Sequence, residues 1–142
     1  MLDACDAVYI CTWTAEHARL VEAACARGLA VFCEKPLAFD ARGAEAMAAT
    51  VERAGVVNQV GLVLRRSPAF FLLRALVRDP DAGRVMSVAF RDDQYIPVQG
   101  MYASTWRGDR ALAGAGTMLE HAIHDVDLIE HCIGPVASVS AR

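Results

Sequence analysis

The chain has 142 residues, of which 55% are hydrophobic, and a formal net charge of -3 at pH 7. This length and composition are typical of one compact globular domain or of pieces of two. No basic cluster accompanies the negative net charge, which argues against nucleic acid and anionic membrane surfaces as partners and favours a small molecule.

Cysteine usage and the lack of targeting signals predict a cytoplasmic protein. The five cysteines are odd in number and none forms a CxxC pair, so we expect reduced thiols. No basic start followed by an apolar stretch indicates a signal peptide. The longest apolar segment, around 69–77, is interrupted by Arg74, so no membrane span is expected.

The first 64 residues alternate between short apolar, partly β-branched runs and segments of helical spacing. This pattern predicts strands at 7–11, 30–33 and 56–64 and helices at 15–27 and 40–55. Thr12 and Thr14 are candidate caps for the first helix, and Asp40 is the expected cap of the second. Strands and helices that alternate with short connections predict a parallel sheet with helices on its faces, joined by right-handed crossovers. The predicted fold class is therefore α/β and doubly wound.

The pattern changes near Arg65, where we place a boundary between domains 1–64 and 65–142. Beyond it we expect a short helix to Val77 and then a strand at 85–91. The following segment, 92–113, is irregular and polar, which suits a loop over a pocket. Toward the end of the chain, the periodicity predicts one helix over 117–132 and the start of another strand over 136–141.

Glu34-Lys35-Pro36 directly follows the apolar run 30–33, at the predicted end of a strand. Ligands of open α/β sheets bind outside the carboxyl ends of strands, so a lysine there faces a candidate pocket. The proline fixes the local turn. Lys35 is therefore a catalytic candidate, and the alternative is a solvated loop lysine.

The predicted helix 117–132 presents Glu120, His124, Asp127 and His131 along one stripe. A histidine with a carboxylate one turn away is suited to general acid/base chemistry near neutral pH. Glu120 and His124 are therefore the second pair of catalytic candidates. The alternative is a solvated helix face.

Gly114-Ala115-Gly116 imitates the first half of a GxGxxG dinucleotide fingerprint. The third glycine position is occupied by Leu119, and no apolar strand precedes the motif. We interpret it as a turn that lets the backbone approach a ligand or another segment.

Taken together, these motifs resemble the Gfo/Idh/MocA family of oxidoreductases, typified by glucose-fructose oxidoreductase and inositol dehydrogenase. Members commonly show TPxxxH after a strand, then EKP, a WR pair, and a glycine-rich turn leading into D/ExxxHxxD. This chain carries the corresponding residues in the same order over nearly its whole length: Thr12 to His17, Glu34-Lys35-Pro36, Trp106-Arg107, Gly114-Ala115-Gly116, and Glu120, His124 and Asp127. It departs from the family pattern at Trp13 in place of proline, at Ala115 and Ala122 in place of glycine, and at Glu120 in place of aspartate.

The resemblance implies a Rossmann domain that binds NAD or NADP, followed by an α+β domain whose open, mainly antiparallel sheet often mediates homo-oligomerisation. It implies hydride transfer between nicotinamide and a sugar, cyclitol or related polyol or carbonyl substrate. By analogy, His124 is the proton shuttle, Lys35 stabilises the reacting oxygen, and Glu120 binds a substrate hydroxyl or orients His124. Arg107 is implied in substrate binding or loop anchoring. The residues implied to line the nicotinamide side of the cofactor site are Thr12, Trp13, His17, Glu34, Lys35 and Pro36.

The opening strand of the family, its glycine-rich turn and its acidic residue for the ribose have no counterpart in this sequence. We therefore expect 1–64 to supply strands 4 to 6 of a Rossmann sheet with the order 3-2-1-4-5-6. We expect 65–142 to be the first part of the second domain. In this interpretation the chain is a fragment of a longer protein, and alone it binds NAD(H) weakly or not at all.

Two other functions fit parts of the sequence. His121, His124 and Asp125 contain a His-Asp pair found in metal-dependent phosphohydrolases, although the remaining histidines offer no matching ligand pattern. The same fold can also persist as an inactive binding or oligomerisation subunit. Stoichiometric metal in the purified protein would favour the hydrolase. The sequence leaves open the substrate, the reaction direction and the choice between NAD and NADP.

Overall fold

The structure is a computed structural model that describes residues 4–93 and 103–141. The chain divides into two compact units, one of residues 1–61 and 94–120, the other of residues 62–93 and 121–142. These units are defined by which residues contact one another in space. The division of the sequence into domains 1–64 and 65–142 stays a prediction.

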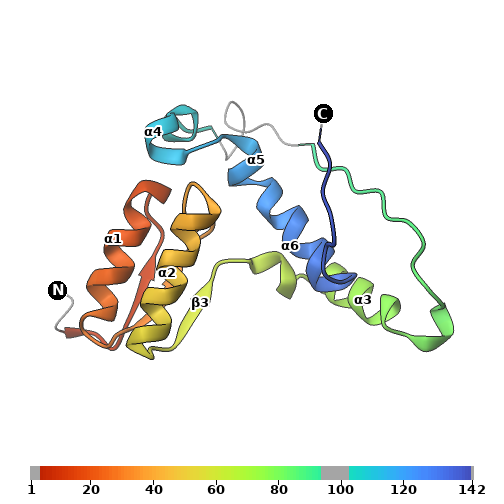
Figure 1. Cartoon of the computed structure of the whole chain (residues 1–142), viewed down its shortest axis with the longest axis horizontal. Coiled ribbons are helices and arrows are strands. Elements are labelled where there is room, and N and C mark those ends of the chain that lie inside the picture. The colour runs from red at the N-terminus through yellow and green to blue at the C-terminus, as the bar shows by residue number, and fades with distance from the viewer. Residues whose placement is uncertain (1–3, 94–102, 142) are drawn as a thin grey trace. The chain divides into compact units, whose positions relative to one another are not determined.

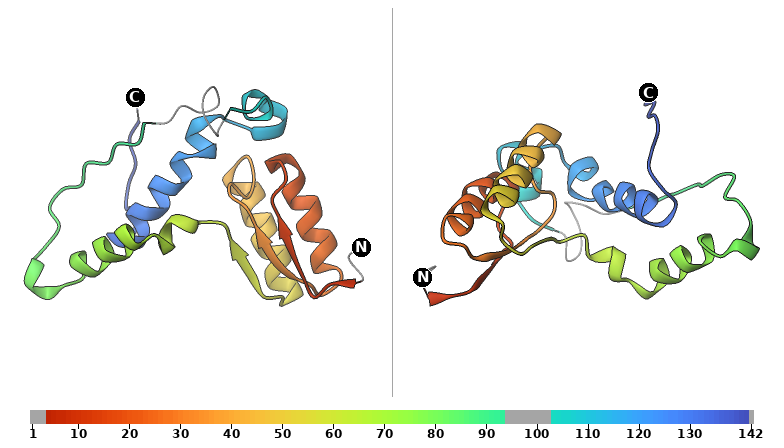
Figure 2. Two further views of the ribbon diagram at one scale, coloured as in Figure 1. Left: turned by 180° about the vertical axis from the view of Figure 1, so that it is seen from behind. Right: turned by 60° about the horizontal axis from the view of Figure 1, so that its bottom comes forward.

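The first unit contains a three-stranded parallel sheet. Its strands are β1 (Ala7–Ile10), β2 (Ala30–Cys33) and β3 (Asn58–Val60), in the spatial order β1-β2-β3. Ala7 is paired with Ala30, and Val31 is paired with Asn58. Helices α1 (Thr14–Cys25) and α2 (Ala41–Ala54) lie on the same face of this sheet (Figures 1 and 2). The predicted parallel α/β fold is confirmed.

The core of this unit lies between the sheet and its two helices. Alternate side chains of a strand point to opposite faces, so one set faces α1 and α2 while Tyr9 and Phe32 lie on the other face. Tyr9 is 60% exposed. Burial of the apolar side chains that face α1 and α2 removes them from water and stabilises the packing of the helices on the sheet. The buried hydrophobic residues of this cluster are Ile10, Val21, Ala24, Leu29, Val31, Cys33 and Met47.

The helix boundaries confirm one predicted cap and correct another. Asp40 caps α2, since its carboxylate accepts the Gly43 N–H at 2.7 Å. Gly55 ends the same helix in the left-handed region, with φ of 64°. The cap of α1 is Trp13, which makes no side-chain cap hydrogen bond, so the predicted threonine caps are wrong. The Thr14 hydroxyl instead donates to the Glu120 carboxylate.

The second unit is built around two helices, α3 (Pro68–Val77) and α6 (Ala122–Cys132). Short 3-10 helices precede and follow α3, at Val63–Arg66 and Pro80–Ala82. Arg65 donates from Nε to both carboxylate oxygens of Asp127, at 3.0 and 2.9 Å. The hydrogen bond to Asp127 is also the main reason that the pKa of Arg65 is raised. This pair ties the 3-10 helix before α3 to α6.

Three strand predictions need correction. The third strand spans only Asn58–Val60, and after Gly61 and Leu62 the chain enters the 3-10 helix Val63–Arg66. Among the described residues, 85–91 and 136–141 form no strand. Both segments have the apolar, β-branched composition of strands, but a strand is stable only when a neighbour completes its hydrogen bonds. Their exposed side chains, such as Met86 at 82% and Val139 at 85%, show that neither segment is packed as part of a sheet.

The predicted loop over 92–113 is only partly described, because 94–102 lie outside the described residues. Its later part contains a 3-10 turn at Trp106–Gly108 and the short helix α4 (Arg110–Ala113). Asp109 caps α4 by accepting the Ala111 N–H at 2.8 Å. None of the helices in the described ranges is both long and apolar enough to cross a membrane.

Cys33 should react far more slowly with iodoacetamide than Cys11 in the native protein at neutral pH. Burial, and secondarily the Glu34 carboxylate, raise the pKa of Cys33 from 9.0 to about 11, so its nucleophilic thiolate is scarce. Cys11 is exposed. Timed alkylation followed by peptide mass spectrometry measures both rates, and unfolding in urea should make them similar. Equal rates in the native protein would contradict the burial of Cys33.

Candidate functional site

Lys35, the only lysine in the chain, lies just beyond the carboxyl end of β2. Its Nζ donates a hydrogen bond to the backbone carbonyl of Glu120 and lies 4.0 Å from Oε2 of the same residue. Its side chain is 18% exposed. Lys35 is therefore a partly buried ammonium group held by Glu120, and not a solvated loop lysine.

The surroundings of Lys35 act on its pKa in opposite directions. Desolvation by burial is the largest effect and lowers the pKa of Lys35 below its ordinary value of 10.5. The Glu120 and Glu34 carboxylates raise it, and Arg107 lowers it. The net pKa is lowered, so the amine gives up its proton more readily than a surface lysine. That is a property of lysines that take part in acid/base chemistry.

Glu120 is the buried carboxylate at the centre of this group, with 3% of its side chain exposed. Oε1 accepts the Thr14 hydroxyl at 3.3 Å, and Oε2 lies 3.9 Å from Arg107 Nε. A buried carboxylate is stable only when paired and hydrogen-bonded. Lys35, Arg107 and Thr14 together meet that requirement.

The single helix predicted over 117–132 is wrong, because it is interrupted at His121. The observed helices are α5 (Thr117–Glu120) and α6, and the His124 N–H donates to the His121 carbonyl at 2.9 Å. In a continuous helix the Glu120 carbonyl would accept that N–H. Here the Glu120 carbonyl accepts Lys35 Nζ. The predicted stripe of Glu120 and His124 on one continuous helix is therefore also wrong.

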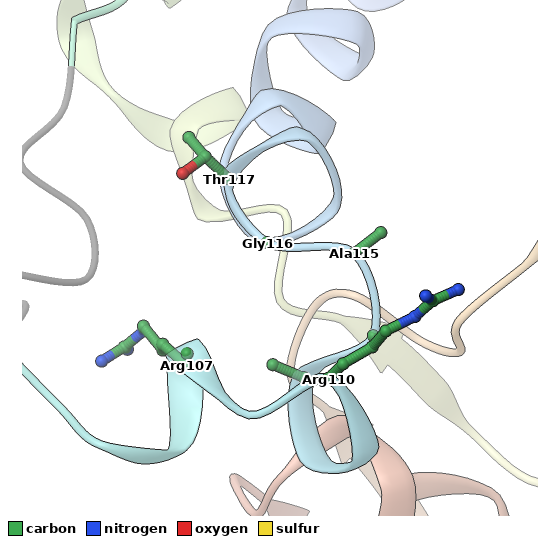
Figure 3. Close-up of a pocket in the computed structure, with 8 residues that line it drawn as sticks. Arg107, Arg110, Ala115, Gly116 and Thr117 are labelled. Atoms are coloured by element: carbon green, nitrogen blue, oxygen red, sulfur yellow. The ribbon is translucent and has the colours of Figure 1, made fainter.

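Arg107 is anchored within its own loop as well as beside Glu120. Its Nη1 donates to the Ser104 hydroxyl at 3.1 Å, and its guanidinium carbon lies 4.5 Å from the centroid of the Trp106 ring. A cavity of about 470 Å³ adjoins it, lined by Arg107, Gly108, Arg110 and 113–117. Figure 3 shows the Arg107 and Arg110 side chains pointing in different directions. Arg107 thus combines a contact to Glu120 with a position at a cavity wall.

The glycine-rich turn 114–116 forms part of this cavity wall, and it also meets another segment of the chain. Gly114 has φ of +88°, and a Cβ built there would lie 2.7 Å from Cδ1 of Phe39. Only glycine fits this backbone conformation and this contact without strain. The turn therefore brings its backbone against the loop that follows Lys35.

His17 connects the start of α1 to the loop after Lys35. Its ring is 1% exposed, with Nδ1 2.9 Å from the Pro36 carbonyl oxygen and Nε2 3.2 Å from the Thr12 carbonyl oxygen. Trp13, which lies between Thr12 and His17 in sequence, is 47% exposed. His17 thus organises the backbone around Thr12 and Pro36, with both ring nitrogens directed at carbonyl oxygens.

The structure places at this site three residues to which the sequence patterns assign no site role. The Tyr9 hydroxyl donates to Glu34 Oε1 at 2.8 Å, and Gly61 adjoins the Glu34 carboxylate. Thr14 reaches Glu120 across 106 positions in sequence. Such partners come from distant segments, so local periodicity carries no signal for them.

His124 belongs to the second unit, where it is buried on α6. Its ring lies edge-on to His121, with 5.9 Å between ring centroids. His121 Nε2 lies 2.7 Å from Asp92 Oδ2. Burial, and secondarily the Asp92 carboxylate, raise the pKa of Asp125. Within the described ranges, no group of three or more His, Cys, Asp or Glu side chains is arranged to hold a metal ion.

Comparison with known proteins identifies the family. Residues 1–62 match the oxidoreductase family with an NAD-binding Rossmann fold, and residues 70–142 match the GFO/IDH/MocA C-terminal domain. The chain belongs to the GFO/IDH/MocA family. The resemblance inferred from its motifs is confirmed.

Members of the GFO/IDH/MocA family that resemble this chain include sugar and inositol dehydrogenases. Levoglucosan dehydrogenase of Pseudarthrobacter phenanthrenivorans is 29% identical, over 88% of this chain and 32% of its own length. Inositol 2-dehydrogenase of Rhizobium meliloti is 32% identical, over 91% of this chain and 37% of its own length. The solved structure of a levoglucosan dehydrogenase with NADH and levoglucosan is 28% identical, with a TM-score of 0.77, over 94% of this chain and 36% of its own. The chain thus spans about a third of the length of these relatives.

Proposed function

We propose that this chain is part of an NAD- or NADP-dependent oxidoreductase that acts on a sugar, a cyclitol or a related polyol or carbonyl compound. The observation that supports this most directly is Lys35, a partly buried ammonium group at the carboxyl end of β2, held by Glu120. Ligands of parallel sheets bind at this edge. The relatives' names, levoglucosan dehydrogenase and inositol 2-dehydrogenase, support the substrate class.

In this proposal Lys35 donates a hydrogen bond to the reacting oxygen of the substrate and stabilises the negative charge that develops there. By resemblance to the family, His124 takes the hydroxyl proton during oxidation and returns it during reduction. Glu120 holds Lys35 in its ammonium form and binds a neighbouring substrate hydroxyl or orients His124. Arg107 anchors Glu120 or contacts the substrate.

By resemblance to the family, residues at the strand ends line the nicotinamide part of the cofactor in this proposal. When bound, the nicotinamide cofactor would supply the hydride-transfer chemistry. Thr12 and Trp13 follow β1, and Lys35 and Pro36 follow β2. The His17 ring is directed at the carbonyl oxygens of Thr12 and Pro36, so it would hold both backbone segments in place at this edge. A cytoplasmic location and assembly into a homo-oligomer belong to the same proposal.

The whole protein that contains this chain should reduce NAD or NADP when supplied with levoglucosan, myo-inositol or a related polyol. The measurement is the ultraviolet absorbance of the reduced nicotinamide, with each cofactor tested against each polyol. The reverse direction is tested with the corresponding carbonyl compounds. Binding of NADH without turnover in either direction would contradict the proposal and favour a binding subunit.

A further inference from the structure

The Glu34 carboxylate lies where the ends of all three strands of the sheet meet. Its Oε1 accepts the hydroxyl of Tyr9, a β1 residue, at 2.8 Å. Its Oε2 accepts the backbone N–H of Lys35, just beyond β2, at 3.3 Å. On the third side it faces Gly61, the residue that follows β3. Both oxygens of Glu34 are thus engaged by groups of the chain itself.

Gly61 has no side chain, and the Glu34 carboxylate occupies the space that a side chain there would fill. A Cβ built on Gly61 would lie 2.6 Å from Oε2 and 2.9 Å from Cδ of Glu34. The Gly61 N–H donates to the Cys33 carbonyl at 2.9 Å, which fixes its backbone against β2. Any side chain at position 61 would therefore displace the Glu34 carboxylate.

Tyr9 holds its hydroxyl in a defined place because its ring is stacked on Phe32. The two ring centroids are 4.2 Å apart, with 15° between the planes. The pKa of Tyr9 is raised, mainly by its hydrogen bond to Glu34. The hydroxyl therefore keeps its proton and remains a donor to the carboxylate.

We infer that Tyr9, Glu34 and Gly61 are positioning residues for Lys35, and that Glu34 acts through Lys35 and not by contacting the cofactor. The inference deepens the proposed function, in which Lys35 contacts the reacting oxygen. Glu34 holds the Lys35 backbone, and Lys35 can then extend its Nζ to Glu120. Tyr9 and Gly61 in turn keep the Glu34 carboxylate in place.

The test is an NMR titration of Lys35 in protein grown with isotopically labelled lysine. Lys35 is the one lysine of residues 1–142, and comparison with a Lys35→Arg variant identifies its side-chain signal. The charged groups that act on Lys35 are Glu120, Glu34 and Arg107. Glu34 raises the pKa of Lys35, so releasing or neutralising its carboxylate should move the titration midpoint to lower pH.

Tyr9→Phe and Glu34→Gln should each lower the midpoint, and Gly61→Ala should do the same by displacing the carboxylate. Glu45→Gln is the matched control for Glu34→Gln, because it makes the same change at an exposed position of α2. Its midpoint should equal that of the wild type. In the whole protein, Tyr9→Phe should lower kcat and leave the NADH dissociation constant unchanged.

An unchanged Lys35 midpoint in both Tyr9→Phe and Glu34→Gln would overturn the inference. A rise in the NADH dissociation constant of Glu34→Gln, without a change in the Lys35 midpoint, would also overturn it by making Glu34 a cofactor ligand. The titration reads Lys35 directly and needs no turnover. A wild-type protein that is inactive would therefore count against the proposed function alone.

Discussion

Lys35→Met should reduce kcat of the whole protein by about 10²–10³-fold, the range found when one donor to a developing oxyanion is removed. Methionine has nearly the length of lysine but carries neither charge nor donor. We expect the NADH dissociation constant to change much less, since the interaction lost forms mainly as charge develops on the substrate oxygen. Steady-state kinetics and an NADH fluorescence titration on the same preparation measure the two effects.

Arg53→Met is the matched control for this substitution. It makes a similar change, from a cation to methionine, on α2 of the same unit, where the exposed Arg53 guanidinium donates to the Thr50 hydroxyl at 3.1 Å. Its turnover should equal that of the wild type. Thermal unfolding of both variants checks that the fold is kept. Wild-type turnover in a folded Lys35→Met protein would remove Lys35 from catalysis.

The elements whose stability is local were predictable from the sequence. Asp40 and Gly55 mark the ends of α2 because a cap and a left-handed residue act within one helical turn. The short strands β1 and β2 also follow from their apolar runs. The segment 85–91 has the same composition, but strand formation depends on a neighbour, and composition cannot show whether one is present.

The site residues that belong to sequence motifs could be predicted, and those brought in by tertiary contacts could not. Lys35 and Glu120 come from motifs in a fixed order, and the structure brings the two together. Local patterns do not predict the break between α5 and α6, because the apolar periodicity continues through His121 and Lys35 approaches from 85 positions away. The predicted cap role of Thr14 fails for the same reason, since its hydrogen-bond partner Glu120 is distant in sequence.

Glu120→Ala should lower the free energy of unfolding of the first unit by about 3 kcal/mol, the low end of the range for removing one partner of a buried ion pair. The change leaves Lys35 and Arg107 without the carboxylate that balances them, and it leaves the Thr14 hydroxyl without its acceptor. Urea denaturation followed by tryptophan fluorescence reports on this unit, because Trp13 and Trp106, the only tryptophans, both belong to it.

Glu120→Gln separates the charge of Glu120 from its volume. Glutamine fills the same space and can still accept the Thr14 hydroxyl, so its remaining loss of stability reports the missing charge. Glu120 is the carboxylate that most raises the pKa of Lys35, so the Lys35 titration midpoint should fall in both variants. The exposed Glu45→Gln is the control and should change stability by less than about 0.5 kcal/mol. If Glu120→Gln matched the wild type in both stability and Lys35 titration, the ion pair between Lys35 and Glu120 would contribute nothing, and the site would lose its central contact.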